Sequence, residues 1–202
     1  LRVYTQDNFG EDLIFNVRDG NIYYWDTSAD NLGTDRAVPL TAVLGGALWV
    51  SGTSYTVGAK VYSPVNYHSY ECIINVSGTT DPSADAANWL QISDGTTPTK
   101  AKQVLVSDRD RHVVVFGTDS ETAIGTMDPL LIRFSNQESV TTWTATADNT
   151  AGDLRVGAGS EIVCAVETRQ QVLVFTDVSL HAMQFLGPPF TFGIDQISEN
   201  IT

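Results

Sequence analysis

The chain has 202 residues, and 11 Lys and Arg residues against 24 Asp and Glu residues give it a formal net charge of −13 and a pI near 4.3. This balance argues against a protein that grips nucleic acid electrostatically, because such proteins need a basic patch to neutralise phosphates. Hydrophobic residues make up 42% of the chain and aromatic residues 9%, which is enough to build a core and argues against acidic, aromatic-poor disorder.

In chain order, three segments share one pattern: two runs rich in β-branched and aromatic residues on either side of a polar turn. Such a pattern, without any long 3.6-residue periodicity, predicts β-hairpins rather than helices. After the third hairpin the pattern continues into residues 179–185, which predicts a meander of three antiparallel strands. The predicted hairpins and their turns are residues 12–25 with Arg18-Asp19-Gly20, residues 104–116 with Arg109-Asp110, and residues 162–175 with Thr168-Arg169-Gln170.

The hairpins recur at a comparable interval. Phe116 and Phe175 are 59 positions apart, whereas Trp25 and Phe116 are separated by a longer interval that contains a segment of different character, residues 49–90. Once that segment is removed, the two intervals become similar. A repeat of roughly 40 to 60 residues, each forming a small antiparallel sheet, is typical of β-propellers. The alternative is an ordinary β-sandwich with coincidental spacing.

We therefore predict an all-β fold of partial, propeller-like antiparallel sheets with a small inserted β module. The scaffold is predicted to be discontinuous, over residues 1–48 and 91–202, with the module over residues 49–90. A propeller needs at least four blades, and the roughly 160 scaffold residues suffice for three. We expect the chain to be a fragment, or other segments or subunits to complete the ring.

The inserted segment, residues 49–90, resembles the small chitin-binding type 3 fold, also described as carbohydrate-binding module families 5 and 12. In that family a Trp opens the domain, a Tyr and a Gly set a turn before a strand, an aromatic strand follows, and a Pro and a Trp close it. The chain departs from chitin-binding members at Cys72-Ile73-Ile74, where they carry exposed Trp residues. The matching positions are Trp49, Tyr55, Gly58, Val61, Tyr67, Pro82 and Trp89.

The aromatic residues of this segment are candidates for glycan recognition. Sugar rings stack their apolar C–H faces on flat aromatic side chains, while their hydroxyls need polar partners. The candidate glycan-binding residues are therefore Trp49, Tyr55, Tyr67 and Trp89. The alternative is that these aromatic side chains form the core of the module, because so small a unit buries little other surface.

No catalytic, cofactor or metal motif is recognised in the sequence. The three histidines, His68, His112 and His181, are isolated and more typical of solvated or satisfied core residues than of metal ligands. The two cysteines, Cys72 and Cys164, lack metal-site spacing and are interpreted as small buried hydrophobes. We predict that the protein is not an enzyme and binds no cofactor. No apolar stretch approaches the roughly 20 residues that span a bilayer, so no membrane insertion is expected.

The scaffold is similar to virion proteins of tailed bacteriophages, most of all to the propeller-containing tail nozzle or hub proteins of short-tailed phages. In that family a strand reading Arg-aromatic-Ser precedes a loop that ends in Trp, and a later hairpin has a Leu-Val-Phe strand followed by Ser-Leu. Arg133-Phe134-Ser135, Trp143 and residues 173–180 fit these places. The segments that carry the resemblance, including these residues, are 7–13, 128–135, 140–143, 152–157 and 172–180.

This resemblance implies a structural component of a phage tail, located in the virion and partnered by a homo-oligomeric ring and other tail proteins. The inserted module is then a decoration that contacts cell-surface or environmental glycans. DNA is expected only as passing cargo, since an acidic tube wall repels phosphates and keeps them from sticking. The alternative is an extracellular protein, either a secreted glycan-binding protein or the non-catalytic part of a glycoside hydrolase.

Overall fold

The computed structural model describes residues 2–28, 36–187 and 190–201. Strands dominate these residues, and the helical parts are two short 3-10 helices, η1 (Leu40–Gly45) and η2 (Pro82–Ala84). The strands pair antiparallel except for β5 with β7, so the predicted all-β class is confirmed. No helix among the described residues is long and apolar enough to cross a membrane.

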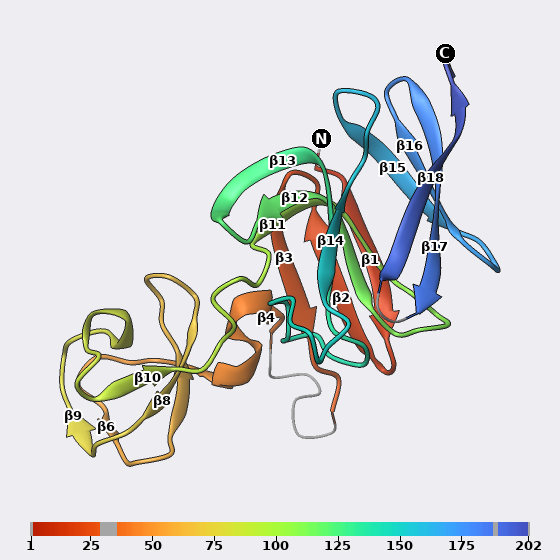
Figure 1. Ribbon diagram of the computed structural model, residues 1–202. Coiled ribbons are helices and arrows are strands. Elements are labelled where there is room, and N and C mark those ends of the chain that lie inside the picture. Colours follow the sequence, from red (N-terminus) through yellow and green to blue (C-terminus); the bar gives the residue numbers. More distant parts are fainter. Residues whose placement is uncertain (1, 29–35, 188–189, 202) are drawn as a thin grey trace.

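The first meander occupies the N-terminal part of the chain, drawn in red in Figure 1. Successive strands pair antiparallel, and the predicted hairpin over residues 12–25 is confirmed as β2 and β3. Asp19, in the turn between these two strands, has a φ of 59°, in the left-handed region that Asp tolerates better than most residues. The strands are β1 (Tyr4–Phe9), β2 (Asp12–Val17), β3 (Gly20–Trp25) and β4 (Val38–Pro39).

The second meander follows the inserted segment. It contains the predicted hairpin over residues 104–116 as β11 and the start of β12. Two residue pairs, Asn21 with Lys100 and Gly20 with Ala101, connect β3 to β11 and merge the first two meanders into one eight-stranded sheet, in which β4 pairs with β3 beside the main path. The strands are β11 (Lys100–Val106), β12 (Val113–Ser120), β13 (Ala123–Phe134) and β14 (Gly152–Arg155).

The third meander is a separate four-stranded sheet near the C-terminus, drawn in blue in Figure 1. The predicted hairpin over residues 162–175 is confirmed as β15 and β16, and the predicted strand over residues 179–185 lies within β17. The strands are β15 (Ile162–Glu167), β16 (Val172–Thr176), β17 (Ser179–Gly187) and β18 (Thr191–Glu199).

The three meanders are stacked, with the second in the middle. Strand β12 is buried on both faces because its side chains alternate between two cores. Val113 and Val115 contribute to the core shared with the first meander, and Val114 and Phe116 to the core shared with the third. The scaffold therefore has three layers and two cores, which distinguishes it from a simple two-layer sandwich.

The repeat has a different register from the one that the sequence predicts. The hairpins over residues 104–116 and 162–175 are the first hairpins of their meanders, whereas residues 12–25 form the second hairpin of theirs. The true counterpart is the hairpin of β1 and β2, which begins at Tyr4. Strand β1 escapes recognition because its centre, Thr5-Gln6-Asp7-Asn8, is polar, and its side chains bond the neighbouring meander rather than fill a core.

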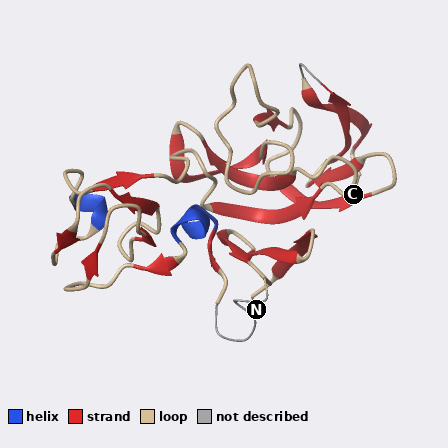
Figure 2. Cartoon of the chain, turned by 90° about the horizontal axis from the view of Figure 1, so that it is seen from below, coloured by secondary structure: helices blue, strands red, loops and turns tan. Residues whose placement is uncertain are grey.

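The inserted segment forms two small sheets of its own, at one side of the scaffold in both ribbon views (Figures 1 and 2). Its strands begin at Ala47 and end at Gln91. One sheet has the order β10-β8-β7-β5, and β6 pairs with β9. The strands are β5 (Ala47–Leu48), β6 (Ser54–Tyr55), β7 (Lys60–Tyr62), β8 (Ser69–Cys72), β9 (Val76–Ser77) and β10 (Trp89–Gln91).

Helix η1 attaches this module to the scaffold. Leu40 at its start belongs to the core of the first two meanders. Thr41 donates a hydrogen bond to the Tyr67 carbonyl at 2.7 Å, and its own carbonyl accepts one from Ser69 Oγ at 3.1 Å. Gly45 packs so closely on β7 that a Cβ there would lie 2.7 Å from backbone atoms. The helix therefore belongs to both parts and limits their relative movement.

Candidate functional site

The described residues contain no group of three or more His, Cys, Asp and Glu side chains that could hold a metal ion. Each histidine pairs with a hydroxyl: His68 with Ser93, His112 with Thr150, and His181 with Ser179, at 2.8 to 2.9 Å. Burial lowers the pKa of all three imidazoles. Within residues 2–28, 36–187 and 190–201, no carboxylate is hydrogen-bonded to any of these histidines, as a Ser-His-Asp triad would require.

Three of the four predicted glycan-binding residues lie in the core of the inserted module. Trp49 is 8% exposed and Trp89 is 3% exposed, so neither ring offers a face to a sugar. Tyr55 is half-buried, meets Trp89 edge-on at 5.2 Å and accepts a hydrogen bond from the Val50 N–H at 2.8 Å. Their positions correspond to the structural alternative, in which aromatic residues supply the core of a small unit.

Tyr67, the fourth candidate, is 46% exposed and lies apart from the other three. It lines a pocket of about 140 Å³ between the module and the scaffold, together with Asn66 of the module and Asn21 of β3. The Asn66 amide also donates to the Tyr70 hydroxyl at 2.8 Å. An exposed aromatic ring between two amides has the chemistry for a sugar ring and its hydroxyls.

Each meander of the scaffold has two faces. We call the face on the side of the next meander along the chain the forward face, and the opposite face the backward face. In the first and last meanders the faces are named by their correspondence to those of the second. On β12, Val114 and Phe116 lie on the forward face, and Val113 and Val115 lie on the backward face. All four side chains are at most 1% exposed. Every interface within the scaffold thus joins a forward face to a backward face.

The backward face of the first meander, here called the N-terminal end face, belongs to neither core. Phe15 and Tyr23 stack on it, with ring centroids 5.4 Å apart and planes 18° apart. Tyr4 at its edge is 55% exposed. Side chains at directly paired positions share a face, and this relation defines its members. They are Tyr4, Gln6, Asn8, Leu13, Phe15, Val17, Tyr23, Trp25 and Pro39.

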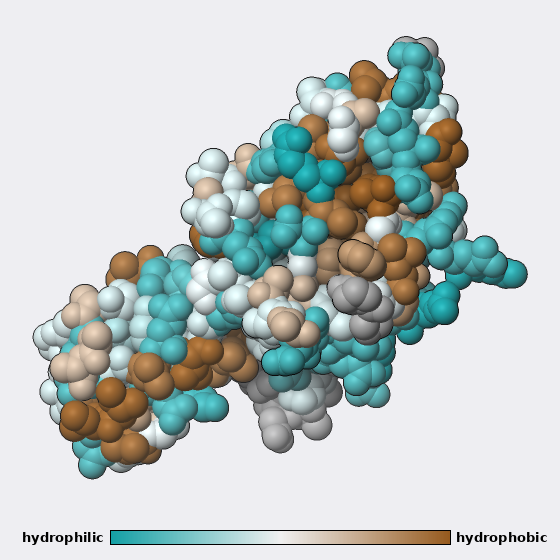
Figure 3. Space-filling model, in the orientation of Figure 1, coloured by the Kyte–Doolittle hydropathy of each residue, from teal (hydrophilic) through white to brown (hydrophobic). Residues whose placement is uncertain are grey.

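The forward face of the third meander, here called the C-terminal end face, is also apolar and outside both cores. Figure 3 shows apolar surface over this meander, at the upper right. Val166 is 50% exposed, and Phe175 is half-buried. Two sheet faces that no layer of the described residues covers, at opposite ends of one stack, are a feature of interaction surfaces. The members of this face are Cys164, Val166, Leu173, Phe175, Leu180 and Ala182, with the polar Asp195 and Ser198 on its β18 edge.

Equivalent side chains bridge the first strands of neighbouring meanders. Thr5 Oγ on β1 accepts a hydrogen bond from the Val104 N–H on β11 at 3.0 Å. Gln103 on β11 accepts one from the Ala165 N–H on β15 at 2.8 Å. The pairing register makes Thr5 equivalent to Gln103 and Val104 equivalent to Ala165. The same contact is therefore used at both interfaces.

Acidic side chains gather where the three first strands approach one another. Asp7 Oδ2 accepts from the Val106 N–H at 2.8 Å, and Glu167 Oε1 accepts from the Asp108 N–H at 3.1 Å. Burial raises the pKa of Glu167, and the negative charges of Asp108, Asp7 and Asp110 raise it further. Like charges brought this close disfavour the ionised form of Glu167.

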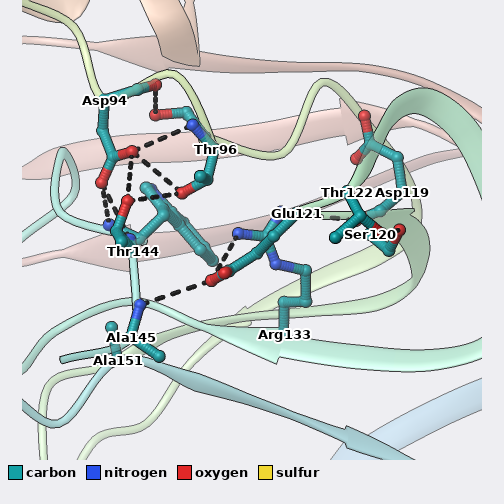
Figure 4. A network of polar contacts seen from close by, with 12 residues as sticks. Asp94, Thr96, Asp119, Ser120, Glu121, Thr122, Arg133, Thr144, Ala145 and Ala151 are labelled. Carbon is teal, nitrogen blue, oxygen red and sulfur yellow. Dashed lines mark hydrogen bonds and ion pairs between the residues drawn. The ribbon is translucent and has the colours of Figure 1, made fainter.

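A polar network fixes the return of the chain from the module into the scaffold (Figure 4). Asp94 accepts hydrogen bonds from the backbone N–H groups of Thr96, Trp143 and Thr144 at 2.8 to 2.9 Å. Burial raises the pKa of Asp94, but these bonds and one from the Thr144 hydroxyl outweigh it and bring the pKa to about 2. Asp94 thus fastens the loop between β13 and β14 to the linker that follows the module.

Arg133 on β13 is a buried cation in the same network, with a side chain 1% exposed. Its Nη1 donates to the Asp119 carbonyl at 3.3 Å, and its Nη2 lies 3.5 Å from Glu121 Oε1. The guanidinium also lies over the Trp143 ring, 5.9 Å from its centroid. Burial lowers the pKa of Arg133, and the carboxylates of Glu121 and Asp119 raise it again. These contacts hold the loop in place, although Arg133 Nε is buried without a hydrogen-bond partner and Arg133 and Glu121 line a pocket of about 260 Å³.

No protein-family model, curated protein or solved structure matches the chain. The sequence reasoning missed the two end faces, although a signal for them was present. In β2 and β16, apolar residues occupy both alternate sets, as in Leu13-Ile14-Phe15 and Val172-Leu173-Val174-Phe175. A strand with apolar side chains on both faces is expected to have a layer on each.

Proposed function

We propose that this protein is a non-enzymatic structural component of a bacteriophage tail, part of a ring like that of a nozzle or hub. The observation that carries the proposal is the pair of uncovered apolar end faces on a stack of repeated meanders. Exposed apolar faces do not stabilise a monomer, whereas a component of an assembly uses them to bind its neighbours. The phage context itself rests on the sequence resemblance.

In this proposal the three meanders are blades of a β-propeller, and β1, β11 and β15 are the inner strands. The repeated contacts of Thr5 with Val104 and of Gln103 with Ala165 support this arrangement, because blades of a propeller meet through equivalent positions. Further blades would complete the ring, as the forward and backward faces require.

The acidic residues at the meeting point of the first strands support a lumen that lets DNA pass. Asp7, Asp108, Asp110 and Glu167 would give its wall a negative charge, which repels phosphates. Changing Asp108 and Asp110 to Lys should then slow genome release from assembled particles. Unchanged release kinetics would contradict a lumen-facing role of these acids.

The partners in this proposal are further copies of the chain and other tail proteins, and its location is the virion. The test is to purify particles from cells that carry the encoding genome and to locate the chain with an antibody against the inserted module. A fixed copy number per particle and labelling at the tail are expected. Absence of the chain from purified particles would contradict the proposal.

The alternative function is that of a secreted glycan-binding protein or the non-catalytic part of a glycoside hydrolase. The pocket at Tyr67 favours it, because this ring is the exposed aromatic group among the four candidates. Retention of a monomeric chain on a polysaccharide column, lost on Tyr67→Ala, would support this alternative. The same retention by a ring-forming chain would assign glycan contact to the module of a tail protein.

A further inference from the structure

The two end faces belong to the two types of face that pack together inside the stack. Within the stack, the forward face of the first meander covers the backward face of the second, and the forward face of the second covers the backward face of the third. The C-terminal end face is a forward face and the N-terminal end face is a backward face. One copy of the chain therefore presents both halves of an interface that it already contains twice.

We infer that the C-terminal end face of one copy packs on the N-terminal end face of a second copy, in a head-to-tail contact that repeats the internal interfaces. This inference rests on the proposed function and names the surfaces through which copies associate. A contact of this kind joins different surfaces on the two partners, so it closes into a ring when its rotation allows.

The apolar residues at the two ends correspond to residues that are buried inside the stack. Phe175 occupies in the third meander the position of Phe116 in the second, and Phe116 is 0% exposed between layers. Phe15 occupies the position of Val115, which is also 0% exposed. A hollow of about 490 Å³ opens beside Phe15 on the N-terminal end face; its walls are mainly apolar and aromatic, with Gln6 and Arg36 as polar members, and a ring such as Phe175 can pack on them.

The register also specifies which residues meet. Gln103 bonds the backbone of Ala165 across the second interface, and Cys164 occupies the place of Gln103 in the last meander. Gln6 occupies the place of Ala165 in the first meander. Cys164 of one copy therefore lies against Gln6 of the next. Cys72, the other cysteine, is 0% exposed inside the module and does not react in the folded chain.

The first test is chemical cross-linking of the full chain carrying Gln6→Cys, with a short bis-maleimide. We expect a ladder of covalent oligomers from this variant. The ladder should disappear in the double variant Gln6→Cys, Cys164→Ser, which removes one of the two thiols. A matched control, Val57→Cys, places an equally accessible thiol on the module and should give no ladder. Equal ladders from Gln6→Cys and Val57→Cys would overturn the inference.

The second test separates head-to-tail contact from face-to-face contact. Phe15→Glu disables the N-terminal end face and Phe175→Glu disables the C-terminal end face, so each variant alone should be monomeric. An equimolar mixture retains one intact contact and should give a 1:1 dimer that does not grow. Both side chains are half-buried, and an unchanged circular dichroism spectrum verifies that each variant is folded. Dimerisation of either variant alone would overturn the inference.

These outcomes also separate the inference from the function on which it rests. If the wild-type chain forms rings and both Glu variants still form them, the end faces are not the contact, whereas the ring of the proposed function stands. If the wild-type chain stays monomeric at every concentration and is also absent from purified particles, both fail. If it binds only other virion proteins through these faces, the second copy is overturned as the occupant and the tail function stands.

Discussion

Gln103 and Ala165 bond each other twice across the boundary between two sheets. The Gln103 amide donates to the Ala165 carbonyl at 2.6 Å and accepts from the Ala165 N–H at 2.8 Å, as a neighbouring strand would. Thr5 and Val104 form the corresponding contact one meander earlier. A side chain thus replaces a backbone partner at each layer boundary, which satisfies the exposed strand edge and keeps successive sheets in one register.

Gln103→Ala should therefore destabilise the scaffold. The substitution leaves a buried N–H and a buried carbonyl of Ala165 without partners, which costs about 1 to 3 kcal/mol. Chemical denaturation monitored by fluorescence measures this loss. Gln184→Ala is the matched control, because Gln184 is exposed and bonds only the Gln171 side chain. Equal stabilities of the two variants would show that the bridge contributes nothing.

Arg133 should contribute far more to the stability of the fold than Arg155, an exposed arginine of the neighbouring strand. Arg133→Ala removes a buried cation from beside Glu121 and from the Trp143 ring, and breaking a buried pair costs about 3 to 5 kcal/mol. Arg155→Ala breaks an ion pair with Asp128 whose arginine is 59% exposed, and exposed pairs contribute about 0 to 1 kcal/mol. Thermal unfolding of both variants compares the two losses. A smaller loss of stability for Arg133→Ala than for Arg155→Ala would contradict a stabilising role of this network.

The depressed pKa of Asp94 gives the chain a specific acid lability. A carboxyl group with a pKa of about 2 in the folded state and an ordinary value in the unfolded state stabilises the fold above the ordinary value. This stabilisation is lost as the pH falls from about 4 toward 2. Asp94→Asn should lower stability at pH 7 by about 2 kcal/mol, since an amide is a weaker acceptor for these N–H groups.

The difference between wild type and Asp94→Asn should shrink as the pH falls through this window, because protonation removes the same charge from the wild type. Unfolding curves measured between pH 7 and pH 2 test this convergence. A constant difference across the window would mean that the charge of Asp94 is not what fastens the loop.

Substitutions of buried and of exposed aromatic residues in the inserted module should change its stability by different amounts. Trp89→Ala removes a core ring and should cost about 3 to 5 kcal/mol, as large-to-small core changes do. Tyr67→Ala changes an exposed side chain and should alter stability by less than about 0.5 kcal/mol. Hydrogen exchange in the module measures the stability of both variants. Retention on polysaccharide columns separately measures their glycan binding. Preserved folding of Trp89→Ala would contradict its place in the core.

The sequence predicted the strands of three hairpins, whose apolar residues fill cores, and missed the first strand, β1, whose side chains are polar, as well as the last strands of the meanders. The hairpins around Phe116 and Phe175 were recognisable because β-branched and aromatic residues alternate in them. Strand β1 was not, because Thr5 and Asp7 serve as hydrogen-bond acceptors for the next sheet. Such a role depends on a partner far along the chain, which local patterns do not encode.

The candidate site was less predictable than the fold. Aromatic composition identified Trp49, Tyr55, Tyr67 and Trp89 as a group, but composition does not distinguish a ring that stacks on a ligand from one that fills a core. In a module with so few apolar residues, Trp49 and Trp89 are needed for the core. Only Tyr67, held at a φ of 59° in the loop before β8, remains exposed.

The central claim is that the stack of meanders is made for association through its ends. Native mass spectrometry of the purified 21.9 kDa chain across a range of concentrations tests it most directly. Because each copy carries a net charge of −13, association should strengthen as salt screens the repulsion between copies. The account predicts one discrete oligomer at a whole-number multiple of the chain mass. A chain that remains monomeric at every concentration and salt would contradict it.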